Sequence, residues 1–269
     1  MALLSLPEPF SFELSTERFR AFGVDLANLW HEGGLHRVVD GREVRVEAAN
    51  GGVRVDPVDP RIEAEVRFLL GEPFELDAFT TWAGADDVLA PLALRFAGFR
   101  PPLSPDPWEM LVGSITAQQV SMFAAFAIRN RFVERFGERH ERAYSFPARE
   151  RVAAADEADL VAFGFSRRKA EYVIGLARSG LDLAALRALT DDEVRAAITA
   201  QRGLGDWTAD WFLARHLARP TAWPSGDLAL RKAVVAFYGA VDDVRAFGAR
   251  FDPFQNLTAH YLLLGLRIP

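Results

Sequence analysis

The first part of the chain alternates between apolar and polar residues in short runs that end at turn dipeptides. Residues 35–39 and 43–47 flank Asp40-Gly41, a typical two-residue β-hairpin turn. In the second run, valines alternate with charged residues, which is the period of a strand with one buried face. A further turn at residues 50–52 precedes residues 53–55. The pattern predicts an antiparallel meander, with helices beside it at residues 61–70 and 76–82.

From about Asp87 onward the apolar spacing changes to the three- and four-residue period of amphipathic helices. The proline-rich residues 99–107 cannot be helical, because proline lacks the backbone donor and fixes φ. One apolar stripe then runs from Trp108 to Phe126 and predicts a single helix. Further helices are expected at residues 151–163, 167–179, 191–201, 206–217, 228–238 and 256–266. The chain is therefore predicted to be an α+β protein, with an antiparallel-sheet domain in residues 1–86 and an all-helical domain in residues 87–269.

Composition and charge limit the kinds of site that this chain can form. The chain has 269 residues, half of them apolar, which is enough for one or two domains with a sizeable core. The formal net charge is −6, so attraction to a polyanion must come from a local surface. The absence of cysteine excludes disulfides, thiolate zinc sites and a cysteine-held iron–sulfur cluster. The five histidines show no ligand spacing such as H-E-x-x-H, so no metal site is expected.

Targeting signals are not expected either. Residues 1–10 contain two prolines and no basic run, unlike a signal peptide. No apolar run reaches the roughly 18 residues that a membrane span needs. We therefore expect a cytoplasmic protein that enters no membrane, and nothing in the sequence implies a protein partner.

Two glutamines interrupt the apolar stripe. Gln118 and Gln119 stand three and four residues after Ile115, where apolar residues would continue the pattern. A buried amide without partners costs about 1–3 kcal/mol. One interpretation is a polar link between this helix and a neighbouring loop, and the other is that this turn of the helix faces a ligand.

A glycine-spaced turn, Gly203-Leu204-Gly205, separates two predicted helices. Glycine permits a tight turn, and the unpaired N–H groups at the start of the second helix form an anion site. An ordinary helix–helix turn would have the same pattern. With Trp207 and Thr208 opening the second helix, the segment also fits a helix–hairpin–helix that grips a DNA phosphate without reading sequence.

Asp227 follows Pro224 and Gly226, which end the preceding run, and comes directly before a predicted helix. Aspartate is a favoured N-cap residue, and that role alone would explain it. The same position also lets a carboxylate point into a cleft, where the helix dipole keeps it ionised. The basic pair Arg231-Lys232 fits either phosphate contacts or a solvated face.

Four motifs follow one another within about residues 87–269: Asp106-Pro107-Trp108 with Gln118-Gln119-Val120-Ser121, Gly164-Phe165-Ser166-Arg167-Arg168-Lys169-Ala170, Gly203-Leu204-Gly205-Asp206-Trp207-Thr208-Ala209 and Pro224-Ser225-Gly226-Asp227-Leu228. In kind and order they resemble motifs of the helix–hairpin–helix DNA glycosylase superfamily. The most similar branch is the 3-methyladenine DNA glycosylase II family, which also carries an N-terminal α+β domain built on an antiparallel sheet. The chain lacks the four-cysteine loop of the related endonuclease III branch. It also has Arg202 and Gly203 where bifunctional members of that branch place a lysine, so no lyase activity is expected.

The resemblance implies roles for these residues on double-stranded DNA that contains damaged bases. Asp227 is the expected catalytic residue, because a carboxylate beside C1′ stabilises an oxocarbenium-like sugar and orients the attacking water. Gln119 matches the position that fills the gap left by the flipped nucleotide. The expected walls of the base pocket are Trp207, Trp211 and Trp223, although aromatic residues four apart also commonly form core.

The hairpin is expected to hold a DNA phosphate, mainly through backbone N–H groups. Its carbonyl oxygens would hold a monovalent cation when DNA is bound, and no other cofactor is expected. The hairpin departs from the family pattern because it lacks the usual Leu-Pro at its start. Near the C-terminus, His260 and Tyr261 stand near the place of a family aromatic in a register that the sequence does not fix, which predicts a more open pocket. The expected phosphate contacts are Gly203, Leu204, Gly205 and Thr208.

The expected activity is a monofunctional DNA glycosylase that excises alkylated bases, such as 3-methyladenine and 7-methylguanine, in base excision repair. These bases carry a positive charge and leave readily, so one carboxylate suffices. Tryptophan faces would favour such a cationic base by about 1–2 kcal/mol, so neutral uracil or 8-oxoguanine should leave more slowly. Two alternatives stay open: a glycosylase for deaminated or oxidised bases, and a non-catalytic module that binds DNA through the hairpin alone.

Overall fold

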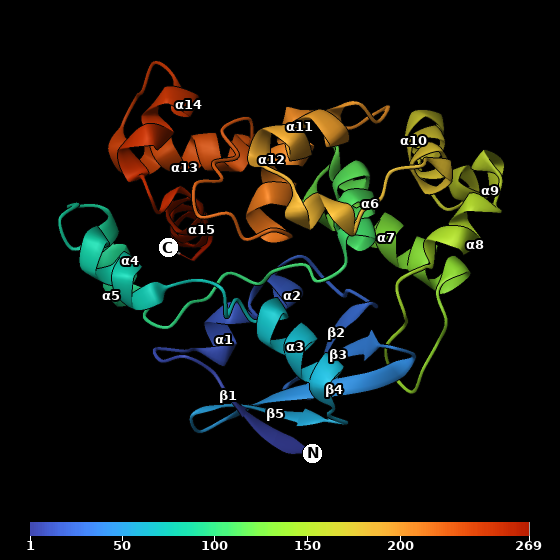
Figure 1. Cartoon of the computed structure of the whole chain (residues 1–269), viewed down its shortest axis with the longest axis horizontal. Helices are drawn as coiled ribbons and strands as arrows, with labels where there is room; N and C mark the ends of the chain where they lie inside the picture. The colour runs from blue at the N-terminus through green and yellow to red at the C-terminus, as the bar shows by residue number, and fades with distance from the viewer. Residues whose placement is uncertain (269) are drawn as a thin grey trace.

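The computed structural model describes residues 1–268 and shows a sheet part below a larger helical part (Figure 1). The five strands form one antiparallel sheet in the order β1-β5-β4-β3-β2. The α+β class predicted from the sequence is confirmed. The strands are β1 Ala2–Ser5, β2 Asn28–His31, β3 Gly34–Val39, β4 Arg42–Ala49 and β5 Gly52–Asp56.

The predicted hairpin turn at Asp40-Gly41 is confirmed. Asp40 and Gly41 have φ values of 49° and 69°, and Val39 pairs with Arg42 across the turn. Two positive φ values are typical of a type I′ turn, whose twist matches the strands that it joins. A similar turn at Glu32-Gly33 joins β2 to β3. Neither this turn nor the short strands β1 and β2 were predicted from the sequence.

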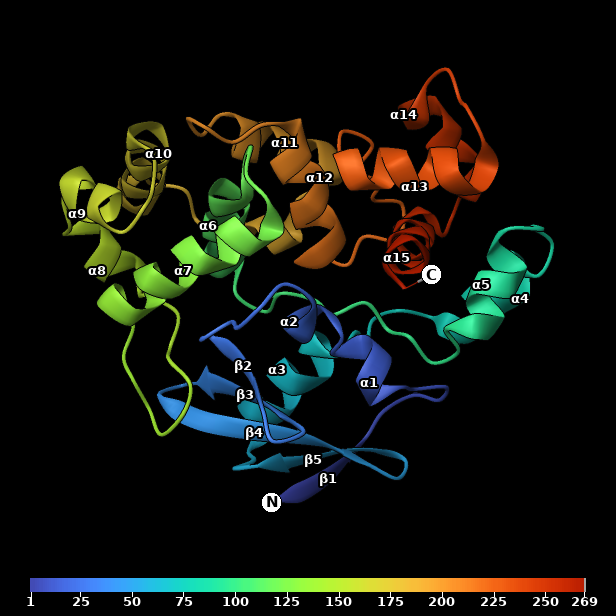
Figure 2. The same cartoon turned by 180° about the vertical axis from the view of Figure 1, so that it is seen from behind.

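Helix α3 (Pro60–Leu69) packs against the sheet, and its Ile62 is fully buried with Leu35 and Val46 of the strands. Asp59 starts this helix by accepting hydrogen bonds from the backbone of its first turn. The short helices α1 (Phe12–Ser15) and α2 (Arg18–Ala21) lie between β1 and β2 in the chain. Figure 2 shows α2 on the side of the sheet part that faces the helical part.

The helical part is built around a core of large apolar side chains such as Phe132, Ile198 and Phe212, all fully buried. Within residues 1–268, no helix has the length and apolar character needed to cross a membrane. Short 3-10 helices occur at Ala185–Ala188 and Gly248–Phe251. The α-helices that follow residue 100 are α6 Pro107–Ala117, α7 Met122–Phe136, α8 Arg149–Ala153, α9 Glu157–Ala162, α10 Arg167–Arg178, α11 Asp191–Thr199, α12 Asp206–Arg215, α13 Leu228–Tyr238, α14 Val244–Phe247 and α15 Gln255–Arg267.

The apolar stripe that predicts one helix belongs to two. Helix α6 ends at Ala117, and Gln119 has a left-handed φ of 55°. Ser121 then starts α7, because its Oγ accepts a hydrogen bond from the backbone N–H of Ala124 (3.3 Å). The prediction of a continuous helix was wrong because α6 and α7 bury their apolar faces in the same core, so the period continues across the break.

The helix predicted at residues 151–163 is also two helices, α8 and α9. Asp156 separates them through a capping box with Asp159. The Asp156 side chain accepts from the backbone of Asp159, and Asp159 Oδ2 accepts from the Asp156 N–H (3.1 Å). This reciprocal pair starts a new helix inside the predicted one.

Helices α4 (Leu76–Ala83) and α5 (Leu89–Arg95) lie beside the C-terminal helix α15 (Figure 1). Phe79 of α4 lies with its ring 4.8 Å from that of Tyr261 and 5.8 Å from that of Phe254. Helix α4 precedes the boundary expected at residue 86, yet its core contacts are with the C-terminal helices. We propose that the division lies nearer Gly71, directly after α3.

Buried charged side chains join the two parts. Glu109 of α6 forms ion pairs with Arg37 of β3 (2.9 Å) and Arg129 of α7 (2.5 Å), and Arg129 also pairs with Asp25 (3.2 Å). Burial alone would raise the pKa of Glu109, but the two guanidinium groups outweigh it and lower this pKa to about 2. Glu109 is therefore ionised at neutral pH and fixes α6 against strands β2 and β3, through Asn28 and Arg37.

Candidate active site

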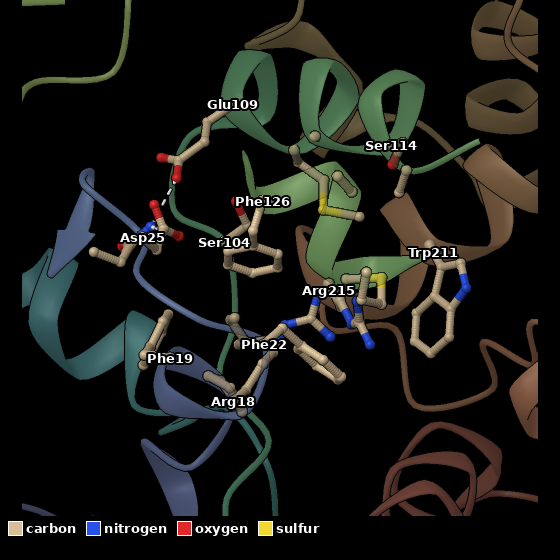
Figure 3. A pocket seen from close by; sticks show the side chains of 18 of the residues that line it. Arg18, Phe19, Phe22, Asp25, Ser104, Glu109, Ser114, Phe126, Trp211 and Arg215 are labelled. Atoms are coloured by element: carbon tan, nitrogen blue, oxygen red, sulfur yellow. Dashed lines mark hydrogen bonds between the residues drawn. The ribbon is translucent and has the colours of Figure 1, made fainter. Parts of the chain in front are cut away.

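A cavity of about 260 Å³ lies between the sheet part and the helical part. Its walls include side chains of α2, α6, α7, α12 and α15, and several of them are shown in Figure 3. Pockets for drug-sized molecules usually span about 300–1,000 Å³. This cavity therefore suits a smaller ligand, and it takes contributions from both parts of the chain.

Asp227 lines this cavity at the N-terminus of α13. Its Oδ1 accepts hydrogen bonds from the backbone N–H groups of Ala229 (2.9 Å) and Leu230 (3.0 Å). Its Oδ2 accepts hydrogen bonds from the indole N–H groups of Trp207 (2.9 Å) and Trp211 (3.0 Å). One carboxylate oxygen caps helix α13, and the other is bound by two indoles that line the cavity. Asp227 is therefore both an N-cap residue and a cavity residue.

Trp207 and Trp211 lie one turn apart on α12, and for this reason both indoles reach the same carboxylate oxygen. Both line the cavity, as the sequence predicts. Their N–H groups, however, donate hydrogen bonds to Asp227, a role that was not predicted from the sequence. A hydrogen bond to a charged group contributes roughly 1.5–3 kcal/mol. The two indoles therefore hold the carboxylate in one orientation.

Four N–H donors and the N-terminus of α13 make the surroundings of Asp227 complementary to a negative charge. Each carboxylate oxygen has two donors, so the group is fixed before any ligand arrives. A fixed charge of this kind stabilises positive charge that develops beside it in a transition state, with no reorganisation during the reaction.

Trp223 does not line the cavity, and its prediction as a pocket wall was wrong. Its indole N–H donates to the carbonyl of Val244 (2.8 Å), and its ring packs 5.3 Å from that of Phe251. The turn that follows, in which the Ser225 N–H donates to the Trp223 carbonyl (2.7 Å), separates this ring from Asp227. Trp223 is 7% exposed and is part of the C-terminal core.

Gln119 is exposed at the turn between α6 and α7. The preceding Gln118 donates from Nε2 to the carbonyl of Gly203 (2.8 Å) and so ties this turn to the hairpin. Lys169 donates from Nζ to the carbonyl of Thr116 (2.8 Å) at the end of α6. The interpretation as a polar link is therefore correct for Gln118, whereas the side chain of Gln119 is free to meet a partner molecule.

The hairpin between α11 and α12 depends on glycine at residue 203. Gly203 has a φ of 87°, which favours glycine. A Cβ at this position would lie 2.2 Å from the ring of Tyr172 on α10. The hairpin is therefore packed tightly on α10, which also carries Lys169.

Two of the predicted phosphate contacts are not available. The N–H of Leu204 already donates to the carbonyl of Gln201 (3.1 Å). Thr208 is 1% exposed, and its N–H donates to the carbonyl of Gly205 (2.9 Å). The prediction was wrong for these two residues because the hairpin uses them internally. Gly205, at the start of α12, is exposed and stays a candidate contact.

The carbonyl oxygens expected to hold a monovalent cation are largely engaged. Those of Gln201, Gly203 and Gly205 accept hydrogen bonds from Leu204, Gln118 and Thr208, respectively. A carbonyl oxygen has two lone pairs, so these bonds leave room for a cation, and the monovalent cation at the hairpin stays a prediction.

The register of α15, which the sequence left open, brings His260 to the cavity and turns Tyr261 into the core. The His260 ring lies 5.6 Å from that of Trp211, and the side chain lines the cavity. Burial and the nearby charge of Arg215 lower the pKa of His260 well below its usual value, so the imidazole is neutral. Tyr261 is 1% exposed and donates to the carbonyl of Phe99 (3.1 Å).

Five arginines that were not predicted line the cavity, namely Arg18, Arg37, Arg129, Arg215 and Arg267. Arg267 pairs with Glu17 (2.9 Å), and the guanidinium of Arg215 lies 3.8 Å from the ring centroid of Trp211. Arg18 comes from α2 in the sheet part. Arg215 continues the four-residue spacing of Trp207 and Trp211, a signal that could have found it. Nothing in the sequence places Arg18 beside a helix nearly 200 residues later.

Comparison with known proteins gives the same architecture. The family model described as "HhH-GPD superfamily base excision DNA repair protein" matches residues 112–246. A DNA-3-methyladenine glycosylase of Bacillus subtilis is 32% identical over 242 residues, which cover 84% of this chain and 79% of that protein. A solved 3-methyladenine DNA glycosylase from Archaeoglobus fulgidus superposes with a TM-score of 0.88 at 27% identity, over 98% of this chain and 97% of that one.

A more distant structure shares the fold alone. It is an 8-oxoguanine glycosylase/lyase of Clostridium acetobutylicum in complex with double-stranded DNA, with a TM-score of 0.82 at 19% identity. The match covers 96% of this chain and 92% of that one. The family match spans the hairpin and Asp227, and the Bacillus relative is similar along most of its own length. This chain therefore belongs to the HhH-GPD superfamily of base excision DNA repair proteins.

Proposed function

We propose that this chain is a monofunctional DNA glycosylase that flips an alkylated base out of duplex DNA and hydrolyses its N-glycosidic bond. The observation that carries the proposal is Asp227, whose carboxylate lines the cavity and is held by two indole and two backbone N–H groups. The names of the Bacillus and Archaeoglobus relatives support 3-methyladenine as a substrate.

The geometry suits a reaction in which charge develops on the sugar. As the bond between C1′ and the base breaks, the sugar gains oxocarbenium-like positive charge. Asp227 supplies a fixed negative charge beside it, and each of its oxygens already accepts two hydrogen bonds. We infer that its main contribution is electrostatic, with water adding to C1′ and losing its proton to solvent. A base that already carries a positive charge needs no separate acid to leave.

Flipping the base costs a few kcal/mol, and an exposed side chain that fills the gap offsets part of this cost. Gln119 is suited to that role because it lies on a turn that Gln118 and Lys169 hold in place. Its amide can also hydrogen-bond the base left without a partner. The backbone at Gly205 would hold a phosphate at the start of α12, and such a local contact is compatible with a net charge of −6.

Gln119→Ala should weaken binding to DNA that carries a lesion by about 10-fold, equivalent to ~1.4 kcal/mol, and should affect undamaged DNA less. The reason is that only the flipped state uses the gap-filling side chain. Fluorescence titration with matched duplexes measures the effect. Gln118→Ala, the same change one residue earlier, removes the bond to Gly203 and should lower the melting temperature instead. Equal loss of affinity for both duplexes would contradict the role of Gln119.

Mass spectrometry of the bases released from DNA that carries several defined lesions tests the function itself. We expect free 3-methyladenine and 7-methylguanine from wild-type protein. Release of uracil or 8-oxoguanine alone would assign the chain to another lesion class. Binding without release of any base would support a non-catalytic DNA-binding module.

A further inference from the structure

A phenylalanine on the first turn of α7 is exposed to solvent beside the turn that carries Gln119. Phe123 is 65% exposed, and Val120, the residue that follows Gln119, is 40% exposed. We call these two side chains, Val120 and Phe123, the apolar edge. Burying such side chains is favourable, so their exposure in the free protein costs stability. Neighbouring exposed apolar side chains are typical of interaction surfaces.

The apolar edge is presented by both parts of the chain. The ring centroid of Phe22, which follows α2 in the sheet part, lies 6.1 Å from that of Phe123 and 6.0 Å from that of Phe126. Asn130, later on α7, fixes the same segment because its Nδ2 donates to the carbonyl of Val24 (2.8 Å). The ring of Phe123 is therefore supported from behind while most of it meets solvent.

The apolar edge borders the mouth of the cavity. Phe22 and Phe126 both line the cavity and are shown in Figure 3, whereas Phe123 does not line it. Phe123 also stands only four residues after Gln119. A ligand that enters the cavity past Gln119 therefore has the apolar edge beside it.

The charges beside the edge suit a polyanionic partner. Glu17 and Asp25 flank Phe22 in the chain, and each is paired with an arginine, Arg267 (2.9 Å) and Arg129 (3.2 Å), respectively. The guanidinium of Arg267 also lies 5.7 Å from the ring centroid of Phe22. These two carboxylates are thus neutralised and present little repulsion to phosphate.

We propose that Phe123, with Val120, packs against the base pair that loses its stacking neighbour when the damaged nucleotide flips into the cavity. This inference rests on the proposed glycosylase function and adds a second contact beside Gln119. A nucleotide whose base enters the cavity leaves the duplex at the cavity mouth, where the apolar edge lies. Bases stack favourably on aromatic rings, and apolar side chains placed beside a base step stabilise a kinked duplex.

Binding is measured with an undamaged duplex and with one that carries tetrahydrofuran, a stable abasic analogue, in place of the damaged nucleotide. Phe123→Ala should lower affinity for the abasic duplex about 10-fold, equivalent to ~1.4 kcal/mol, and should affect the undamaged duplex less. Phe123→Tyr keeps the ring and should bind like wild-type protein. Leu94→Ala is the matched control, because it removes an exposed apolar side chain of α5 that does not line the cavity.

Stacking also has a chemical signature. Permanganate oxidises the ring double bond of thymine where the face of the ring is open, so a thymine placed on either side of the tetrahydrofuran reports whether that face is covered. At saturating protein, wild-type protein and Phe123→Tyr should protect a thymine on one side. Phe123→Ala should leave the same thymine several-fold more reactive.

Equal loss of affinity for both duplexes, or unchanged protection in Phe123→Ala, would overturn the stacking role. Unchanged DNA binding with altered sedimentation would also overturn it and would assign the apolar edge to self-association. Release of 3-methyladenine by the same preparations tests the proposed function separately. If wild-type protein releases no base, the glycosylase assignment fails, whereas wild-type release without any difference in Phe123→Ala binding or protection refutes this inference alone.

Discussion

Asp227→Asn is expected to lower the single-turnover rate of base release by about 10²–10⁴, the range for a positioned catalytic group. The substitution removes the charge that faces the developing positive sugar. Oδ1 of asparagine would still accept from Ala229 and Leu230, so the helix cap is kept. Affinity for DNA should hardly change, or should rise as repulsion from phosphate falls. A rate close to that of wild-type protein would contradict the catalytic role.

The asparagine variant needs a control that the sequence alone would not suggest. Its Nδ2 would point two hydrogens at the indole N–H groups of Trp207 and Trp211, where Oδ2 accepted before. Part of the loss would then come from local rearrangement. In a triple variant with phenylalanine at both tryptophans, this clash of donors is absent. If the triple variant recovers the rate, the clash and not the charge is responsible.

The second large effect is expected for Trp207→Phe and Trp211→Phe. Each removes one hydrogen bond to the carboxylate, worth roughly 1.5–3 kcal/mol, so each should slow base release by about 10–100-fold if that energy serves to position the charge. The measurement is the single-turnover rate at saturating enzyme, with the melting temperature recorded for each variant.

Trp223→Phe is the matched control for the tryptophan pair. It also removes an indole hydrogen bond, the one to Val244, but at a site away from the cavity. It should lower the melting temperature and leave the rate of the folded enzyme unchanged. Equal loss of rate in all three tryptophan variants would show that the indoles act through stability and not by holding Asp227.

Local signals in the sequence were sufficient to predict the helices and turns around Asp227. The hairpin glycines, the helix that follows them and the N-cap position of Asp227 all depend on residues within one or two turns of each other. The same holds for the type I′ turn at Asp40-Gly41. Short-range backbone preferences fix such features, and for this reason they could be predicted.

Features that depend on distant packing could not be predicted. The break at Gln119 is hidden because α6 and α7 share one core, and Trp223 was misplaced because a tight turn separates it from Asp227. The position of Arg18 in the cavity depends on the docking of α2 against the helical part, and the ion pair between Asp25, which follows α2, and Arg129 of α7 contributes to this docking. No residue spacing in the sequence shows that Arg18 of α2 lies beside α12.

The most direct test of the central claim is a single-turnover reaction of wild-type protein with a duplex that carries 3-methyladenine. Free base and the DNA strand are analysed separately. We predict that free 3-methyladenine appears while the strand keeps an intact abasic site, because Asp227 acts without a hairpin lysine. Absence of free base, or strand cleavage at the rate of base release, would contradict this account.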